Sequence, residues 1–154
     1  MRRILTACAL AALFALPAAG SAAPRENGTL SVKGATASIS IVGRGALLGH
    51  CSRCTLWIVD PDPTDGTSPV VTPLSAVRTQ LSDSRTRYDG NDLRFKVIGG
   101  FFRVRVTGTG IDLSVVANGS AVVDGQGATF GTYSLDGAAF LPLPSFRVPL
   151  QLGG

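Results

Sequence analysis

Cys51 and Cys54 form the first pair whose type and spacing suggest a chemistry. In an exported protein such a pair is normally oxidised, so the spacing predicts a disulfide that closes a very small loop and stabilises the fold modestly. Two free thiols, a redox-active pair and a metal site are the alternatives. A redox pair normally begins a helix, whereas the flanking segments 47–48 and 56–58 look like strands. A zinc site with His50 and both cysteines would still need a fourth ligand.

Three closely spaced carboxylates, Asp60, Asp62 and Asp65, precede a glycine and are of the kind that binds calcium. The same segment is also typical of an ordinary turn, because Asp-Pro and Asp-Gly pairs favour turns. Thr64 and Thr72 stand where an EF-hand loop has better oxygen ligands. We therefore treat the three aspartates as a candidate calcium site beside the turn interpretation, and the sequence indicates no other cofactor.

Four cations, Arg94, Lys96, Arg103 and Arg105, alternate with apolar residues on either side of Gly99-Gly100. A two-residue glycine loop between alternating segments predicts a hairpin over 93–106. In that register like charges lie opposite each other, which is unfavourable unless an acid, solvent or a bound anion compensates. The functional interpretation is binding of a polyanionic envelope polymer or a glycan. The alternative is a solvated basic face that resists edge pairing. Specific nucleic-acid binding is not expected, because the segment has few aromatics for base stacking.

The residue types available for catalysis are few. The chain has one histidine, His50, and one glutamate, Glu26, which lies in a polar segment near the N-terminus. A Ser-His-Asp triad would have to use His50, and no Gly-x-Ser-x-Gly motif occurs. The sequence therefore predicts a protein that is not an enzyme, with a small secreted hydrolase as the less favoured alternative.

The elements that position these residues are predicted to be strands. The chain has 19 Gly and 9 Pro among 154 residues and only 16% charged residues, a composition that excludes a helix bundle. Alternation predicts strands over 93–98, 101–106, 111–117 and 120–124, with a turn at Asn118-Gly119. Short strands are expected at 70–71, 132–135 and 146–152. One short helix is expected near 73–82, where Thr72-Pro73 resembles a helix start.

The glycine positions also suggest an internal repeat. Residues 30–59 resemble residues 95–124 at a constant offset, which indicates two copies of a four-strand meander joined by a connection over 61–92. Coincidental β patterning is the alternative. The predicted fold is all-β, an antiparallel β-barrel or a two-sheet β-sandwich of about eight to ten strands. Its interior candidates are Ile39, Ile41, Trp57, Phe95, Phe102 and Val104.

The N-terminus has the pattern of a secretory signal. Arg2 and Arg3 precede an apolar run and a small-residue stretch, so we expect a signal peptide over 1–22, a flexible tail over 23–28 and a single all-β domain over 29–154. No second apolar run is long enough to span a bilayer, so the mature protein is not expected to be transmembrane. We therefore expect a secreted or cell-envelope protein of bacterial type. The predicted function is a non-enzymatic binding or envelope module, with a self-assembling envelope protein as the alternative.

Overall fold

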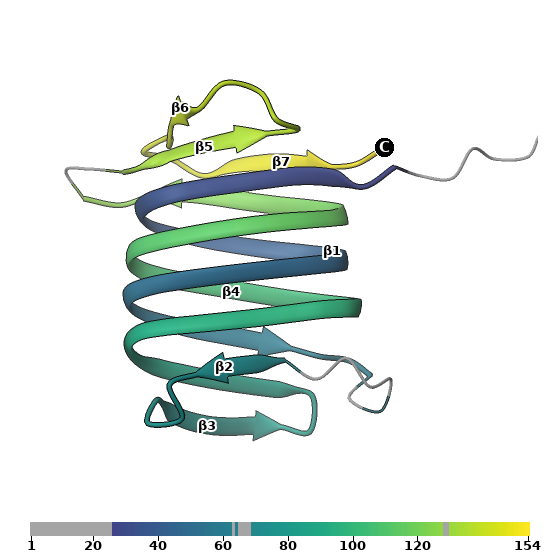
Figure 1. The fold of residues 1–154 in the computed structure, drawn as a ribbon, viewed down its shortest axis with the longest axis vertical. Helices are drawn as coiled ribbons and strands as arrows, with labels where there is room; N and C mark the ends of the chain where they lie inside the picture. Colours follow the sequence, from purple (N-terminus) through teal and green to yellow (C-terminus); the bar gives the residue numbers. More distant parts are fainter. Residues whose placement is uncertain (1–25, 63, 65–68, 128–129) are drawn as a thin grey trace, which may run out of the picture.

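The computed structural model describes residues 26–62, 64, 69–127 and 130–154, and it is built from antiparallel strands. Two of the strands are very long and bend repeatedly (Figure 1). The described residues contain no helix, and so none that is long and apolar enough to cross a membrane. The strands are β1 (Gly28–Val59), β2 (Val70–Thr72), β3 (Val77–Ser82), β4 (Arg85–Gly125), β5 (Thr132–Leu135), β6 (Leu141–Pro142) and β7 (Val148–Leu152).

The long strands β1 and β4 form a two-stranded ribbon that coils on itself. Much of β1 pairs with β4 on both of its edges, so that Ile39 lies beside Val106 on one side and Val123 on the other. These two partners are 17 residues apart along β4, which is the length of one turn of the coil. Figure 1 shows the ribbon crossing the front and the back of the molecule in turn. A ribbon wound in this way produces the two-sheet arrangement of a jelly-roll sandwich.

We call the two sides of this coil layer A and layer B. Layer A contains β5, β2 and the ribbon segments 28–33, 46–50, 94–98 and 111–117. Layer B contains β7, β3 and the ribbon segments 37–43, 54–59, 85–90, 102–108 and 119–125. The layers are continuous through the bends between these segments but do not close into a barrel, because β2 and β3 end the pairing at one side of the coil. The predicted all-β class is confirmed, in the form of an open sandwich.

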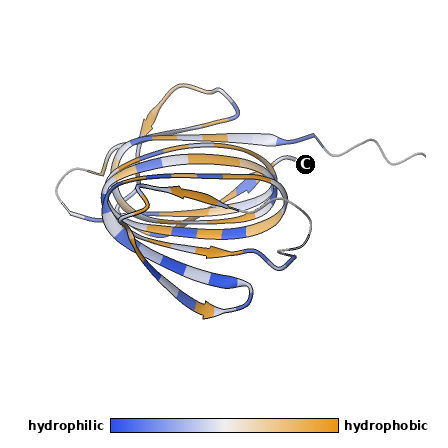
Figure 2. Ribbon diagram, turned by 60° about the horizontal axis from the view of Figure 1, so that its bottom comes forward, coloured by the Kyte–Doolittle hydropathy of each residue, from blue (hydrophilic) through white to orange (hydrophobic). Residues whose placement is uncertain are grey.

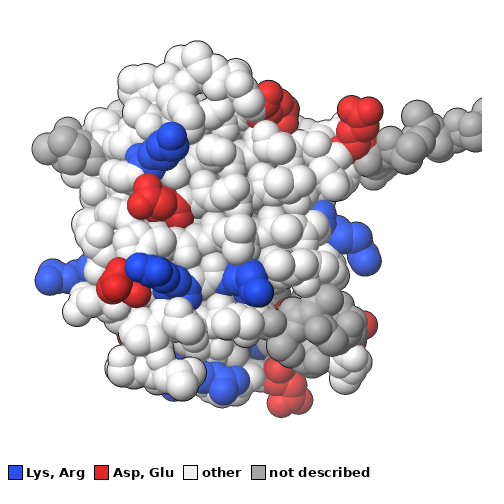
Figure 3. All heavy atoms as spheres, viewed as in Figure 1, with Lys and Arg blue, Asp and Glu red and all other residues white. Residues whose placement is uncertain are grey.

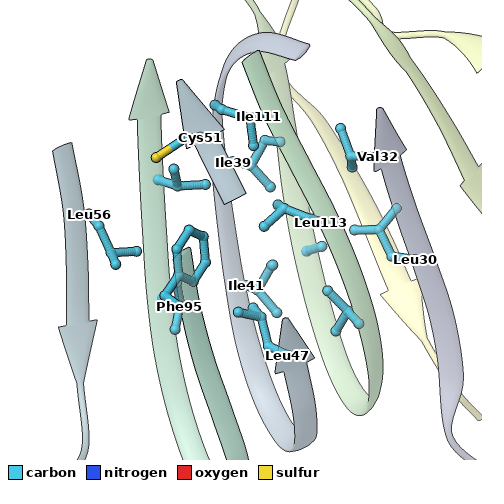
Figure 4. Close-up of a cluster of buried hydrophobic side chains, with 14 of the residues drawn as sticks. Leu30, Val32, Ile39, Ile41, Leu47, Cys51, Leu56, Phe95, Ile111 and Leu113 are labelled. Carbon is cyan, nitrogen blue, oxygen red and sulfur yellow. The ribbon is translucent and has the colours of Figure 1, made fainter. Parts of the chain in front are cut away.

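Strict alternation along both long strands creates the core. Successive side chains of a strand point to opposite faces, so every second residue of each layer enters the space between the layers. Figure 2 shows the resulting alternation of hydropathy along the ribbon, and Figure 4 shows the side chains that meet inside. Five of the six predicted interior residues are buried there: Ile39, Ile41, Phe95, Phe102 and Val104. The sixth, Trp57, alternates outward between buried Leu56 and Ile58 and is only half-buried.

The predicted hairpin over 93–106 is wrong, and so is the doubled meander. Val97 pairs with Leu47 and Phe102 pairs with Gly43, so the residues expected to face each other both pair with β1. Gly99 and Gly100 have φ angles of 81° and 56°, and at these positions β4 bends from layer A into layer B without reversing. Asn118-Gly119 is likewise a bend inside β4 and not a hairpin turn. The similar glycine spacing of 30–59 and 95–124 reflects the regular bends of one ribbon.

The predicted helix near 73–82 is also wrong. Pro73 begins a turn, closed by the Ala76 amide that donates to the Pro73 carbonyl at 3.1 Å, and β3 follows. β3 forms a hairpin with the first residues of β4, for example Thr79 beside Arg87. The helical spacing of Leu74, Val77 and Leu81 therefore coincided with a strand, and all three side chains are exposed. The short strands predicted at 70–71, 132–135 and 146–152 are present as β2, β5 and β7.

Gly49 illustrates how closely the two long strands pack. It lies beside Phe95 on one side and Leu113 on the other, both of which are buried. A Cβ atom at Gly49 would lie 2.3 Å from Phe95 Cζ and 2.7 Å from Leu113 Cδ2. Because both side chains are packed in the core, a Cβ atom at this position requires them to shift.

We expect Gly49→Ala to lower the free energy of unfolding by about 1–3 kcal/mol, because the added methyl overpacks the core. Urea unfolding at neutral pH measures this change, with Gly154→Ala as the control, since a Cβ at Gly154 has nothing within 4 Å. Combining Gly49→Ala with Phe95→Leu should recover part of the loss. Additive effects in this double-mutant cycle would contradict the contact as the cause.

Candidate anion-binding faces

The four cations predicted to form one anion site lie on two opposite surfaces. Arg94 and Lys96 belong to layer A, whereas Arg103 and Arg105 belong to layer B. Arg94 pairs with His50 and Thr72, so it does not lie opposite Arg105 as the hairpin register required. The bend at 99–100 is the physical reason, because it sends β4 into the other layer before the second pair of cations.

On the outer surface of layer B, two further arginines join Arg103 and Arg105. The four arginines lie in two neighbouring rows of the sheet, around the outward residues of β1. We call this surface the arginine face, and it consists of Arg85, Arg87, Arg103 and Arg105 around Trp57 and Val59. Trp57 has Arg87 on one side and Arg105 on the other. Val59 has Arg85 and Arg103 in the equivalent positions. An apolar side chain therefore separates each pair of arginines, which removes the direct like-charge contact that the hairpin implied.

Trp57 contacts two of these arginines directly. The guanidinium carbons of Arg85 and Arg87 lie 4.8 Å and 5.2 Å from the centre of its ring, within the range of cation–π attraction. A groove of about 500 Å³ runs beside the ring. Hydroxyl groups of Ser40, Thr55 and Thr107 line it together with Arg85, Arg103 and Arg105. The arginine face therefore combines cations, one aromatic ring and hydroxyls in a single groove.

One carboxylate moderates the charge of the arginine face. Asp89 receives hydrogen bonds from the Arg87 guanidinium at 2.8 Å and from the Thr55 hydroxyl at 2.6 Å. The Arg87 bond and, after it, the Thr55 bond hold the pKa of Asp89 below its usual value. Among the residues that the structure describes, no carboxylate lies within 4.0 Å of the guanidinium nitrogens of Arg85, Arg103 or Arg105. Within the described part of the chain, Arg85, Arg103 and Arg105 therefore have no carboxylate partner, and Arg105 Nε donates to the Ser38 hydroxyl at 3.3 Å.

Sequence reasoning missed Trp57, Arg85 and Arg87 as parts of this surface. Trp57 was expected in the core, although it stands between the apolar residues 56 and 58 and so alternates outward. The two arginines fall in the segment that the sequence predicts as a connection over 61–92. Their alternation with Thr86 and Tyr88 was the signal for a strand at this position.

The outer surface of layer A brings the single histidine together with two aspartates. Nε2 of His50 lies 2.7 Å from Asp92 Oδ1, and Nδ1 lies 3.6 Å from Asp112 Oδ2. The other Asp112 oxygen accepts the backbone amide of Gly34 at 2.8 Å. The hydrogen bond from His50 lowers the pKa of Asp92.

The contacts of His50 are with carboxylates. Nε2 is hydrogen-bonded to Asp92, whereas the 3.6 Å from Nδ1 to Asp112 exceeds a hydrogen bond, and among the described residues no hydrogen bond joins His50 to a serine. Within the described ranges, no group of three histidine, cysteine, aspartate or glutamate side chains is placed to hold a metal ion. His50 instead links the aspartates of two neighbouring segments of β4.

Cys51 and Cys54 form a disulfide in the structure, as the spacing predicted. Both side chains are buried in the core, and their Cα atoms are 6.1 Å apart. The flanking segments are strands, also as predicted. The pair does not staple a hairpin turn: it spans the bend at which β1 passes from layer A to layer B. The bridge is therefore a buried link between two positions of β1 at this bend.

The candidate calcium residues are only partly described. Asp60 accepts the backbone amide of Asp62 at 3.1 Å, and Asp62 accepts the Thr64 hydroxyl at 2.8 Å, as expected of an ordinary turn. Asp65 lies outside the described residues. The turn interpretation accounts for the contacts of the described part of this segment.

We expect Asp89→Asn to reduce stability at neutral pH and to remove part of the acid sensitivity of the fold. Because the pKa of Asp89 is lowered in the folded state, its carboxylate stabilises the fold above the unfolded pKa of about 3.9, and this contribution is lost as the pH falls through the folded value. Urea unfolding over the acid range measures the difference between wild type and variant, which should shrink as the pH falls. Asp83→Asn, an exposed aspartate close by, controls for net charge. A difference that does not vary with pH would contradict the role of the Arg87 pair.

Opposite sides of the sandwich thus carry two separate groups of cations, an arginine-rich face on layer B and a mixed surface around His50 on layer A. No protein-family model matches the chain, and no curated protein or solved structure matches it significantly.

Proposed function

We propose that this protein is an exported, non-enzymatic module that binds an acidic polysaccharide on its arginine face. The observation that carries the proposal is the placement of four arginines in two adjacent rows around Trp57 and Val59. Export is supported by the signal-like N-terminus over 1–22.

The spacing of the arginines fits a chain with repeated charges. Residues two apart on one strand, such as Arg103 and Arg105, are separated by roughly 6.8 Å along the sheet. Arginines on either side of β1, such as Arg87 and Arg105, are about 9.6 Å apart across two strand spacings. A single carboxylate or sulfate cannot span backbone positions at these separations. Carboxylates or sulfates repeated along a polymer can, and the planar guanidinium matches such groups with paired hydrogen bonds.

The rest of the groove favours a sugar polymer over a nucleic acid. Trp57 and Val59 offer apolar contact area for the body of a sugar ring, and the hydroxyls of Ser40, Thr55 and Thr107 can exchange hydrogen bonds with sugar hydroxyls. Binders of single-stranded nucleic acid stack successive bases on several aromatic side chains. Trp57 is the one aromatic side chain among the described residues that line this groove.

We expect the double substitution Arg103→Ser, Arg105→Ser to weaken binding of polygalacturonate or dextran sulfate by about tenfold or more, because each arginine supplies charge-assisted hydrogen bonds. The fluorescence of Trp57, the only tryptophan of the chain, reports the titration at the site itself. Comparing the carboxylated with the sulfated polymer identifies the preferred anionic group. Raising the salt concentration should weaken binding to either polymer.

Arg44→Ser, Arg53→Ser is the matched control, since it removes the same charge from two exposed arginines that line neither groove. If both double variants lose affinity equally, the binding is a property of net charge and the proposed site is wrong. Tighter binding of single-stranded DNA than of either glycan would also contradict the proposal.

A further inference from the structure

We propose that the protein bridges two acidic polysaccharide chains, one on the arginine face and a second in a groove on the outer surface of layer A. The inference rests on the proposed function, because it assigns the same ligand class to a second site. We call this second surface the histidine groove, and the side chains that define it are Lys33, Leu48, His50, Val70, Arg94, Lys96 and Asp112.

The winding of β4 places the two surfaces back to back. Arg94 and Lys96 precede the bend at Gly99-Gly100, and Arg103 and Arg105 follow it. All four point away from the core, because their neighbours Phe95, Val97, Val104 and Val106 fill it. Sheets of a sandwich pack about 10 Å apart, and the side chains outside each sheet add to that separation. One straight ligand therefore cannot lie in both grooves.

The histidine groove extends across neighbouring segments of layer A and measures about 790 Å³. One row of the sheet carries Asp112, His50, Arg94 and Thr72 side by side. The next row carries Ser114, Leu48, Lys96 and Val70. Figure 3 shows the surface on the side of β2, where basic and acidic side chains gather among uncharged ones. A groove that continues across several strands suits an extended chain better than a compact ligand.

The carboxylates of this groove have close partners within the protein, whereas its cations form no close ion pair with any described residue. Asp112 is held by Gly34 and His50, and Asp92 at the groove margin is held by His50. Within the described part of the chain, no carboxylate lies within 4.0 Å of the side-chain nitrogens of Lys33, Arg94 or Lys96. Lys33 lies over the ring of Phe140 at 4.3 Å, an attraction that leaves its charge uncompensated.

Apolar and hydroxyl groups complete the resemblance to the arginine face. Leu48 and Val70 flank Lys96 and are each 50% exposed, and Ser31, Ser114 and Thr72 line the same groove. Both surfaces therefore offer cations beside apolar side chains and hydroxyls, which is the reason to assign them one ligand class. The histidine groove has more carboxylate near its cations, so we expect it to bind the more weakly of the two.

The test uses the folded protein with a short oligogalacturonide and with long polygalacturonate. We expect calorimetry to find two oligomers per protein, and light scattering to rise when the long polymer is added, because the protein links chains. Arg94→Ser, Lys96→Ser should reduce the stoichiometry to one and abolish the rise in scattering. The Trp57 fluorescence titration of that variant should match wild type, because Trp57 lies only in the first site.

Arg44→Ser, Arg53→Ser again controls for charge, and the thermal transition of every variant checks its folding. The inference is overturned if wild type binds a single oligomer, or if Arg94→Ser, Lys96→Ser still binds two or still links chains. The proposed function survives both of these results. It fails separately if Arg103→Ser, Arg105→Ser leaves the Trp57 titration unchanged.

Discussion

Backbone pairing between β1 and β4 is the interaction on which the rest of the structure depends. A strand has hydrogen-bonding groups on both edges, and buried ones must be paired. The two long strands meet this requirement by coiling, so that segments such as 38–43 and 46–50 of β1 have β4 on both sides. The coil leaves free edges only where short strands end it, at β2, β3 and the strands that follow β4.

This pairing decides where every side chain of the ribbon points. Alternation divides the residues of each strand into an inner and an outer set, and the bends decide to which layer an outer residue belongs. The inner set is almost entirely apolar and includes the Cys51–Cys54 disulfide. The outer set carries the charges. The protein therefore has two charged outer surfaces with one apolar core between them.

The charges on these surfaces are arranged so that the fold tolerates them. On the arginine face, Trp57 and Val59 stand between arginines that would otherwise be cross-strand neighbours. Asp89 neutralises Arg87, and the aromatic ring attracts Arg85. On the other layer, His50 lies between Asp92 and Asp112. In both places the local partners of a few charged groups leave other cations facing solvent, and these are the groups on which ligand binding is proposed.

The sequence alone was enough to predict the all-β class, five of the six interior residues named from it and the short strands at β2, β5 and β7, because alternation and turn residues are local signals. It did not determine which strands pair. Gly99-Gly100 is compatible with a hairpin turn and with a bend, and only the contacts of 93–106 with β1 select the bend. Because β4 bends there, Arg103 and Arg105 lie on the surface opposite Arg94 and Lys96. Strand register is a nonlocal property, set by the summed pairing of segments far apart in the chain, and for this reason the arginine face and the histidine groove could be recognised only in the tertiary structure.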